Sequence, residues 1–461
     1  MTAERLTFET LRAEAEAGRI EEVIVAVPDL QGRLQGSRLS VPHFLDTAAR
    51  DGFGACLYLL ATDVGMDTGP GYAIDAWNTG FGDFVLHPDP ATLRALPWDP
   101  GTALVLADAH WPDGRPVRVA PRRILREQLD ALARRGLTAL AGTELEFLVF
   151  QDSYRQAWES RYHGLRTSTR YNVDYSLQGL SDLEPLVRRI RREMVRAGLT
   201  METARGEVHP GQYEIVFRYD EAMTTCDHHV LFKTGAKQIA AQEGRAVTFM
   251  PKFDEGEGNS CHIHLSLRGT DGSAVLADPH DDDASAGPER GMSALMRHFV
   301  AGQLACLADF TLLMAPNINS YKRLRPGAFA PTGITWGRDN RTCPVRVVGS
   351  GHSLRIEHRV PGGDANPYLA VAAVVAAGMH GIEHRLPLPD PHRANALTDP
   401  AVPRLPATLT EALHRWENSE LATTIFGEAV VGHYAQAART ELAAFESAVT
   451  DWERVRTFER L

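Results

Sequence analysis

The sequence predicts an α+β protein built in two parts, and three observations support this prediction. The chain has 461 residues, more than a single hydrophobic core usually organises. Its N-terminal part contains short runs of Val, Ile, Leu and aromatic residues separated by turn residues, which is typical of strands. Farther along, helical patterns alternate with short strands. We therefore expect a small β-rich domain over residues 1–112 and a larger domain over residues 113–461.

The N-terminal domain is expected to begin with a helix and to continue as strands. Apolar residues repeat at helical spacing over residues 5–18, and Gly18 ends that helix. Strands are expected over residues 22–27, 34–39, 55–60 and 103–107. The Pro- and Gly-containing turn at residues 111–116 is the expected boundary between the domains.

The larger domain is expected to be rich in helices. Residues 121–135 begin with Pro and are followed by Gly136, which is typical of a helix. Further helices are predicted over residues 183–197, 220–244 and 291–313. The most apolar window, residues 369–379, is about half the roughly 20 residues needed to span a bilayer, so we expect a buried Ala/Val helix there.

Composition excludes several classes of protein. Lys and Arg number 48 and Asp and Glu number 59, so the formal charge is −11, which disfavours nucleic acid and anionic membranes as partners. Hydrophobic residues at 44% and charged residues at 23% indicate a folded globular chain. The five cysteines lie far apart with no C-x-x-C pair, and the first residues lack a signal-peptide pattern. We therefore expect a reduced, cytoplasmic protein.

Four short segments gather charged side chains in a pattern that carries chemistry. In three of them the polar side chains occupy every second position, so they share one face of a strand. In the fourth, two carboxylates flank a Pro-Gly-Gln turn that can bring them together. The segments are residues 143–147 (T-E-L-E-F), 261–266 (C-H-I-H-L-S), 355–359 (R-I-E-H-R), and the pair Glu207 and Glu214.

Each segment alone has an ordinary explanation, as the wet face of a strand or a surface ion pair. Together they predict one cavity, because their apolar faces must pack against helices. Several carboxylates in one concave site cannot all stay ionised unless cations neutralise them. Oxygen-rich ligation with one or two imidazoles favours Mg²⁺ or Mn²⁺ over a structural zinc. The sequence therefore predicts a divalent metal site.

A second cluster is basic and lies in the C-terminal part of the chain. Guanidinium groups bind phosphate and carboxylate in a bidentate manner. The sequence has no Walker A motif and no G-x-G-x-x-G motif. A polyacidic metal site with arginines indicates phosphoryl transfer from a metal-bound nucleotide. The arginines are Arg323, Arg341, Arg346, Arg355 and Arg359.

The order of the motifs resembles that of the glutamine synthetase superfamily over nearly the whole chain. The motifs are E-L-E-F, E-x6-E with an internal P-G-Q, G-N-S-C-H-I-H-L-S, N-S-Y-K-R, N-R-x4-R, and R-I-E-x-R followed by A-N-P-Y-L. The resemblance implies an N-terminal β-grasp domain and a C-terminal catalytic domain, whose antiparallel strands form an open barrel backed by helices. It also implies that ATP phosphorylates the γ-carboxylate of L-glutamate and that an amine then attacks the γ-glutamyl phosphate.

The resemblance further implies two to three Mg²⁺ or Mn²⁺ ions per subunit. The metal near glutamate would be held by Glu146, Glu207 and Glu214. The metal that bridges the ATP phosphates would be held by Glu144, His262 and Glu357.

The substrates would be held by residues of the same motifs. L-glutamate would contact Gly258, Arg323 and Arg359. ATP would contact His264, Ser266, Arg346 and Arg355, and Arg341 would steady the transferring phosphoryl group.

Members of the family borrow an N-terminal aspartate from the adjacent subunit to help deprotonate the amine. Asp63 is the candidate here and Asp67 the alternative, because this segment matches the family pattern poorly. The resemblance implies hexameric rings, usually paired as dodecamers, with active sites between neighbouring subunits.

Two departures from the family pattern bear on the substrates. Glutamine synthetases carry a flap glutamate before Ala-Pro that accepts a proton from ammonium, and here Phe329 occupies that position. An apolar ring suits an amine that carries carbon, although neutral drift would also explain it. The family's Asn-Gly pair falls on Glu257 and Gly258, so only Gly258 is carried over.

Among the branches of the superfamily, the chain resembles most the actinobacterial γ-glutamyl-amine ligases, particularly the ethanolamine-using group. The shared segments include D-x-Q-G-R-L-Q-G, Y-R-Q-A-W and F-R-Y-D-E-A. We therefore expect a γ-glutamyl-amine ligase using ethanolamine. The alternatives are a γ-glutamylpolyamine synthetase, an ammonium-using glutamine synthetase with Glu257 in place of the flap glutamate, and a catalytically silent structural homologue.

Overall fold

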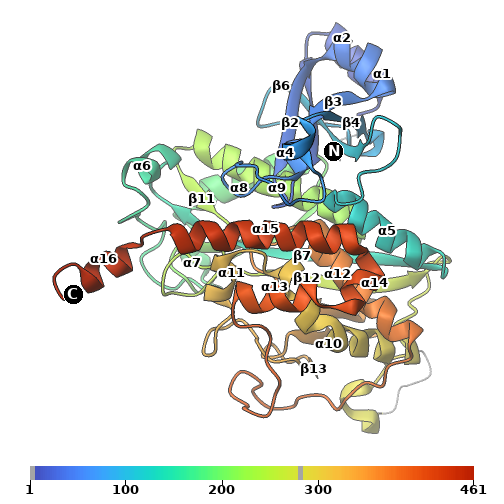
Figure 1. Ribbon diagram of the computed structural model, residues 1–461, viewed down its shortest axis with the longest axis vertical. Helices are drawn as coiled ribbons and strands as arrows, with labels where there is room; N and C mark the ends of the chain where they lie inside the picture. The colour runs from blue at the N-terminus through green and yellow to red at the C-terminus, as the bar shows by residue number, and fades with distance from the viewer. Residues whose placement is uncertain (1–5, 279–283) are drawn as a thin grey trace.

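Two β-sheets organise the chain, a small one near the N-terminus and a larger one in the body of the molecule (Figure 1). The computed structural model describes residues 6–278 and 284–461. The small sheet has six strands in the order β2-β1-β6-β4-β3, with β5 paired to β6. These strands are β1 (Ile20–Pro28), β2 (Leu34–Ser40), β3 (Phe53–Cys56), β4 (Asp83–Pro88), β5 (Arg94–Ala95) and β6 (Gly101–His110).

The sequence anticipated most of this sheet. β1 and β2 form the predicted antiparallel hairpin, from Glu22 opposite Ser40 to Pro28 opposite Leu34. The strand expected over residues 55–60 was wrong in its second half, because Leu57–Leu60 form a 3₁₀-helix. Leu57 and Leu60 are both buried three positions apart, a spacing that suits three residues per turn and not an alternating strand.

The larger sheet has nine strands, and every motif of the predicted metal site lies on one of them or in the turn that joins β8 to β9. Its main order is β13-β14-β15-β12-β7-β9-β8, with β10 and β11 also paired to β7, and it forms the open, barrel-like layer expected from the sequence. The strands are β7 (Leu137–Phe150), β8 (Met201–Gly206), β9 (Gln212–Phe217), β10 (Asp220–Glu221), β11 (Ala246–Thr248), β12 (Cys261–Gly269), β13 (Trp336–Arg338), β14 (Val345–Val348) and β15 (Arg355–His358).

Helices cover the apolar side of this sheet. Leu145 and Phe147 of β7 are fully buried, and α5 and α9 pack on that strand. α12 in turn packs between α5 and α10 and is the predicted Ala/Val helix, buried along almost its whole length. The main helices are α5 (Pro121–Ala133), α8 (Glu184–Arg196), α9 (Ala222–Gln242), α10 (Ala294–Met314), α12 (Pro367–Glu383), α13 (Leu409–Glu417), α14 (Glu420–Phe426) and α15 (Glu428–Ser447).

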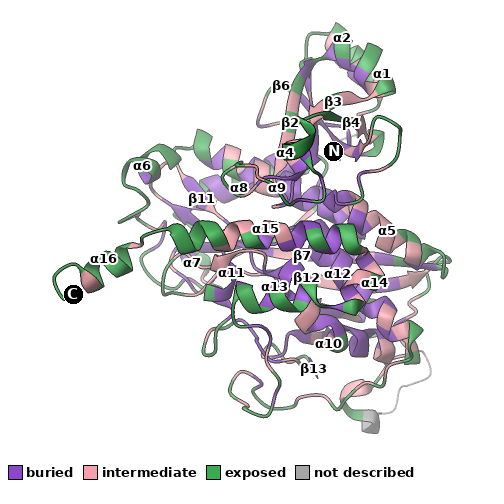
Figure 2. Ribbon diagram, viewed as in Figure 1, coloured by how far each residue is buried: buried purple, intermediate pink, exposed green. Residues whose placement is uncertain are grey.

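The remaining helices are short or lie at the ends of the chain. They are α1 (Phe8–Glu16), α2 (Val41–His43), α3 (Ala49–Asp51), α4 (Ala76–Thr79), α6 (Tyr154–Glu159), α7 (Leu177–Leu180), α11 (Ile318–Arg323) and α16 (Asp451–Thr457). α16 extends away from the body at the C-terminus, and Trp452, Val455 and Phe458 on it or beside it are exposed (Figures 1 and 2). Within the described residues, no helix is both long and apolar enough to cross a membrane.

Buried polar groups join the two sheets. Arg122, on α5, is 2% exposed and pairs with Asp89 and Asp108 from the small sheet unit and with Asp227 on α9. The side chain of Asn366 donates hydrogen bonds to the carbonyls of Asp29 (3.0 Å) and Leu30 (3.1 Å), at the end of β1. Because buried polar groups need partners, these contacts fix how the small sheet sits on the body.

Candidate active site

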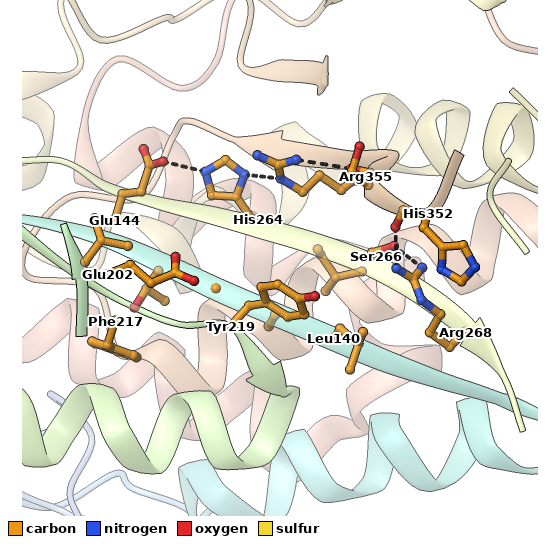
Figure 3. Close-up of a pocket in the computed structure, with 16 residues that line it drawn as sticks. Leu140, Glu144, Glu202, Phe217, Tyr219, His264, Ser266, Arg268, His352 and Arg355 are labelled. Carbon is orange, nitrogen blue, oxygen red and sulfur yellow. Dashed lines mark hydrogen bonds and ion pairs between the residues drawn. The ribbon is translucent and has the colours of Figure 1, made fainter. Parts of the chain in front are cut away.

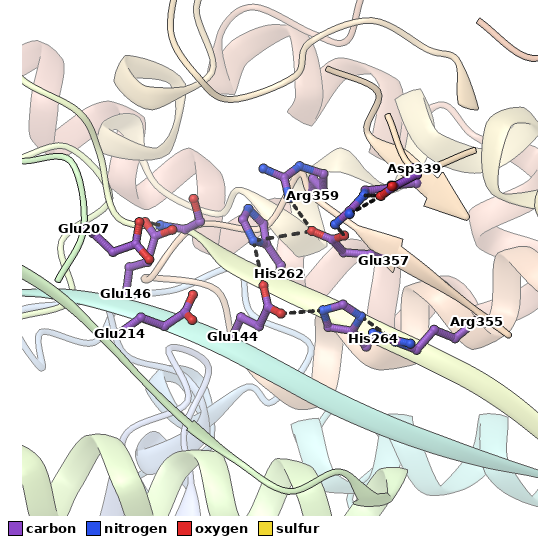
Figure 4. A network of polar contacts seen from close by, with 12 residues as sticks. Glu144, Glu146, Glu207, Glu214, His262, His264, Asp339, Arg355, Glu357 and Arg359 are labelled. Atoms are coloured by element: carbon purple, nitrogen blue, oxygen red, sulfur yellow. Dashed lines mark hydrogen bonds and ion pairs between the residues drawn. The ribbon is translucent and has the colours of Figure 1, made fainter. Parts of the chain in front are cut away.

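The strand register places the predicted charged residues in one row across the larger sheet. His262 lies opposite Glu144, and His264 lies opposite Glu357. Farther along the row, Glu146 lies opposite Glu214. Residues directly opposite one another share a face of the sheet, so the alternating pattern of the sequence becomes one polar surface (Figure 4).

Glu146, Glu207 and Glu214 form the first group at this surface. Each offers a carboxylate oxygen, and these oxygens lie within 4.8 Å of one another. Glu207 reaches the group from the predicted turn between β8 and β9, where its N–H donates to the carbonyl of Gln212 (2.9 Å). Gly211 makes this turn possible, because its φ is +80° and a Cβ there would meet the Val149 carbonyl at 2.8 Å.

Burial and mutual repulsion oppose full ionisation of this triad. Burial and the nearby Glu207 raise the pKa of Glu146 to about 7. Burial and the charge of Glu144 raise the pKa of Glu214 to about 9. Burial also raises the pKa of Glu207. A cation in the triad would remove this penalty, which is the behaviour expected of metal ligands.

Glu144, Glu357 and two histidines form the second group. Oxygens of Glu144 and Glu357 and a ring nitrogen of His264 lie within 4.8 Å of one another. His262 Nδ1 lies 3.3 Å from Glu144 and 3.7 Å from Glu357. Although burial opposes ionisation of Glu144, hydrogen bonds from His262 and His264 hold its pKa below the usual range.

The hydrogen bonds of His264 separate the roles of the two histidines. Arg355 Nε donates to His264 Nδ1 (3.0 Å), so the ring proton lies on Nε2, which donates to Glu144 (2.9 Å). His264 therefore orients Glu144 and has no free lone pair toward it. Burial, followed by the charge of Arg359, lowers the pKa of His262 to about 4, so that ring is neutral at physiological pH. Its Nδ1 lies toward both carboxylates and can act as a ligand once a cation replaces the hydrogen bond to Glu144.

Both groups fit a hard divalent cation. Their donors are carboxylate oxygens with one imidazole each at most, which suits Mg²⁺ or Mn²⁺. One oxygen of Glu214 is buried and receives no hydrogen bond from the part of the chain that the structure describes, which leaves it available as a ligand. The predicted metal residues Glu144, Glu146, Glu207, Glu214, His262 and Glu357 are all brought to this surface.

Predicted arginines surround the two groups. Arg346 and Arg359 both pair with Glu357, and Arg346 also pairs with the exposed Asp339. Arg323 is buried and donates to Ser260 Oγ (3.0 Å), whose N–H donates to Glu146 (2.7 Å). Arg359 Nε is buried and has no hydrogen bond from the described residues, so it remains free to bind an acidic ligand.

A pocket of about 400 Å³ opens beside Glu144 (Figure 3). The predicted nucleotide-side residues His264, Ser266 and Arg355 line it. Sequence reasoning missed other residues of its wall, because they come from separate strands and loops with no shared motif. They include Glu202, Phe217, Tyr219, Arg268 and His352.

Gly258 occupies a crowded position next to the triad. A Cβ there would meet the Pro251 carbonyl at 2.2 Å, so glycine is required. Its carbonyl accepts a hydrogen bond from Gln212 Nε2 (2.9 Å), which also donates to Glu146 (3.1 Å). Gln212 was quoted in the turn motif without a role, and the structure shows that it links the two predicted segments.

Three predicted residues lie outside this cluster. Arg341 is exposed and borders a groove with Asn340 and Arg393. Phe329 is 71% exposed on the loop after α11. Asp63 lies in a turn beside the small sheet, where its carboxylate accepts the N–H of Asp67 (2.9 Å). The contacts described for these residues do not reach the carboxylate groups within one chain.

The comparisons with known proteins agree with this geometry. Residues 118–457 match the family described as "Glutamine synthetase, catalytic domain". The chain is 57% identical over 456 residues to a gamma-glutamylethanolamide synthetase, GlnA4, of Streptomyces coelicolor, covering 99% of this chain and 96% of that protein. It is 34% identical to a glutamate–isopropylamine ligase of a Pseudomonas species, covering 96% and 95%.

Solved structures give the same result for the fold. Two structures of GmaS, one described as an ADP complex and one as the apo form, superpose with a TM-score of 0.83 at 29% identity. Each covers 97% of this chain and 99% of its own chain.

Proposed function

Because the chain belongs to the glutamine synthetase family, we propose that it joins the γ-carboxylate of L-glutamate to ethanolamine with ATP. It is a carbon–nitrogen ligase of the glutamate–amine type. The observation that carries the proposal for ethanolamine is the 57% identity, over nearly the full length, to a gamma-glutamylethanolamide synthetase. γ-Glutamylpolyamine synthesis and glutamine synthesis are the competing activities.

Each of the two groups of candidate metal ligands is assigned to one of the two substrates of the first step. We propose that the triad of Glu146, Glu207 and Glu214 holds one Mg²⁺ or Mn²⁺ beside glutamate, and that Glu144, His262 and Glu357 hold another beside ATP. Bound there, the cations would neutralise negative charge on the phosphates. The pocket beside His264 has the size of a nucleotide site and a mainly apolar wall that carries a few charged and polar side chains.

The protein positions two displacement reactions. A γ-carboxylate oxygen of glutamate attacks the terminal phosphorus of ATP, so that the P–O bond to ADP breaks and γ-glutamyl phosphate forms. The amine nitrogen then attacks the acyl carbon, phosphate leaves and the nitrogen loses a proton. In this scheme Gly258, Arg323 and Arg359 hold glutamate, and Arg346 and Arg355 contact phosphates of ATP. Arg341, on the loop between β13 and β14, is proposed to steady the transferring phosphoryl group.

Phe329 supports an amine that carries carbon. An aromatic ring cannot accept a proton from ammonium, and its exposed position leaves it free to pack on a bound alkyl chain. Asp63 is proposed to accept the proton in the site of a neighbouring copy. Its turn is held by Arg33, which donates to the carbonyls of Asp63 (3.2 Å) and Val64 (2.6 Å). This assignment requires a homo-oligomer, which we propose to be a dodecamer of two hexameric rings.

An amine panel tests the substrate. Phosphate release would be measured with ATP, Mg²⁺ and glutamate plus ethanolamine, putrescine, spermidine, isopropylamine or ammonium, with the product identified by mass spectrometry. We expect kcat/KM for ethanolamine to exceed that for ammonium at least about tenfold, because discrimination by an apolar contact is typically of that order. Phe329→Glu is expected to shift the ratio toward ammonium.

The other possible outcomes of the amine panel lead to different conclusions. If ammonium is the best amine for the wild-type protein, the role given to Phe329 is wrong. If a polyamine is best, the ligase class stands and the ethanolamine assignment fails. Absence of phosphate release with every amine, together with no binding of ATP and Mg²⁺, would identify a catalytically silent homologue.

A further inference from the structure

Arg205 is a cation built into the first carboxylate group. It lies on β8 directly opposite Glu214 in the strand register. Its Nε donates to Glu207 Oε1 (2.9 Å), and its terminal nitrogen lies 2.8 Å from Glu214 Oε1. One guanidinium thus contacts two of the three carboxylates that make up the triad.

The surroundings keep Arg205 in this place. Its side chain is 30% exposed, whereas those of Glu207 and Glu214 are 14% and 1% exposed. The ring of Tyr175 covers the guanidinium at 5.3 Å. A guanidinium is protonated at any physiological pH, so Arg205 carries a positive charge.

The contact is an ion pair with imperfect geometry. Although the Arg205 nitrogen is 2.8 Å from Glu214 Oε1, that oxygen makes no hydrogen bond among residues 6–278 and 284–461. A bidentate arginine normally donates directly along both N–H bonds. The guanidinium therefore lies close to Glu214 without hydrogen-bonding this oxygen, which remains a potential metal ligand.

We propose that Arg205 is a resident counter-cation that stabilises the triad without metal and competes with the divalent ion for it. This inference rests on the triad being a cation site, as proposed above. When no metal is bound, Arg205 holds Glu207 and Glu214 together against their mutual repulsion. When a metal binds, it must share the carboxylates with a fixed positive charge, which weakens its binding. Arg205 is a positioning residue, and its role lies in setting the metal affinity.

The direction of the effect separates this role from a purely structural one. A residue that only maintains the shape of the site would weaken metal binding when it is replaced. Removing a competing cation instead leaves one more uncompensated negative charge beside the metal, so it tightens metal binding. Two unit charges a few ångströms apart at a protein surface interact strongly enough for the change in metal affinity to be measurable.

The experiment compares Arg205→Gln with the wild-type protein. Metal-free protein, prepared with a chelator and then dialysed, is titrated with Mn²⁺ alone in a calorimeter, and its Tm is measured with and without Mn²⁺. We expect Arg205→Gln to bind Mn²⁺ at least about tenfold more tightly and to have a lower Tm without metal. Arg188→Gln is the matched control, since Arg188 pairs with Glu184 on the exposed face of α8.

Arg205→Lys guards against failure of the first variant to fold. Lysine keeps the positive charge, but its single ammonium group cannot bridge two carboxylates as a guanidinium does. We therefore expect this variant to bind Mn²⁺ more tightly than wild type and less tightly than Arg205→Gln. Unchanged or weaker Mn²⁺ binding by Arg205→Gln, or by Arg205→Lys if only that variant folds, would overturn the inference. If the wild-type protein itself binds no Mn²⁺, the metal assignment fails first, independently of which amine is the substrate.

Discussion

Glu357 belongs to the second group of candidate metal ligands and also contacts two of the predicted substrate-binding arginines. It is 1% exposed, pairs with Arg359 and with Arg346 (2.5 Å), and lies 3.7 Å from His262. Burial opposes its ionisation, but the neighbouring guanidinium of Arg359 helps to hold its pKa below the usual range, so it is a carboxylate at physiological pH. One side chain therefore orients a candidate metal ligand and two candidate substrate arginines.

Replacement of Glu357 is expected to abolish the reaction without disrupting assembly. Glu357→Gln keeps the shape but removes the charge that the metal needs, so glutamate-dependent phosphate release should fall at least about 100-fold. Phosphate release and the mass of the assembly in solution are the two measurements. Glu243→Gln, at a surface ion pair with Arg189, is the control. Phosphate release within about tenfold of wild type would contradict the assignment of Glu357.

At the residue scale, the sequence predicted which charged residues share one face of the sheet, because alternation in a strand leaves little freedom. Glu144, Glu146, His262 and Glu357 share a face once their segments are strands in one sheet. Arg205 was not singled out, because a lone arginine two positions before Glu207 is ordinary in sequence. Its importance depends on the pairing of β8 with β9, which places it opposite Glu214.

At the scale of elements, α9 supports the loop that follows β15. Lys233, on the buried side of α9, donates to the Gly363 carbonyl (2.9 Å) and lies 5.4 Å from the centre of the Phe249 ring. Gly363 N–H in turn donates to the Asn259 carbonyl (3.0 Å). Burial, with repulsion from Lys237, lowers the pKa of Lys233 to about 8. This lysine therefore connects the core helix to the segment that carries Gly258.

The lowered pKa makes the stability contributed by Lys233 depend on pH. The unfolded chain keeps the lysine protonated to about pH 10.5, so between about pH 8 and 10.5 the unfolded state binds more protons than the folded state. The free energy of unfolding therefore increases, and the folded state becomes more stable, as pH rises through this range. Below pH 8 the cost of burying the ammonium group is fully present.

Lys233→Met is the variant that reveals this contribution. Methionine fills a similar volume without a charge, so any stability that it adds relative to wild type should shrink as pH rises from 8 to 10.5. The change should reach about 3 kcal/mol, because one pKa unit corresponds to about 1.4 kcal/mol. Chemical denaturation at several pH values measures it. A stability difference that is constant across this range would show that Lys233 has an ordinary pKa.

The elements also mark the limit of prediction from sequence. The long helices α5, α8, α9, α10 and α12 were predicted because each has a clear start, end or apolar face. The 3₁₀-helix Leu57–Leu60 was not, since four apolar residues fit a short strand equally well. Phe329 and Arg341 lie on irregular loops, where no periodic pattern fixes the direction of a side chain.

At the scale of the whole molecule, the C-terminal arm, residues 449–461 including α16, is almost entirely exposed. Trp452, Val455 and Phe458 are 67%, 79% and 87% exposed, and Leu461 is fully exposed. Large apolar side chains clustered on a projecting helix usually mark a surface that another protein covers. The exposed apolar side chains of the arm support the proposed ring assembly, with a second copy of the chain as the partner.

We also propose that the two domains meet at the turn of residues 111–116.

Truncation after residue 448 tests this role of the arm. The carboxylate groups lie on the sheet of the body, so the truncated protein should keep its fold and metal binding but lose the largest assembly. Light scattering coupled to size exclusion would then show a smaller particle. A triple change of Trp452, Val455 and Phe458 to Ser is the finer variant, and Arg454→Ser on the same helix is its control. An unchanged mass for both the truncation and the triple variant would exclude the arm from assembly.

The contact of Asn366 with the end of β1 has a consequence for how the protein is made. The two residues that it joins, Asp29 and Asn366, are 337 positions apart. A ribosome releases the strands of the small sheet long before it reaches Asn366, whose side chain hydrogen-bonds the carbonyls of Asp29 and Leu30. The earliest part of the chain to be synthesised is therefore among the last to be completed, and a nascent chain cannot finish it until most of the body exists.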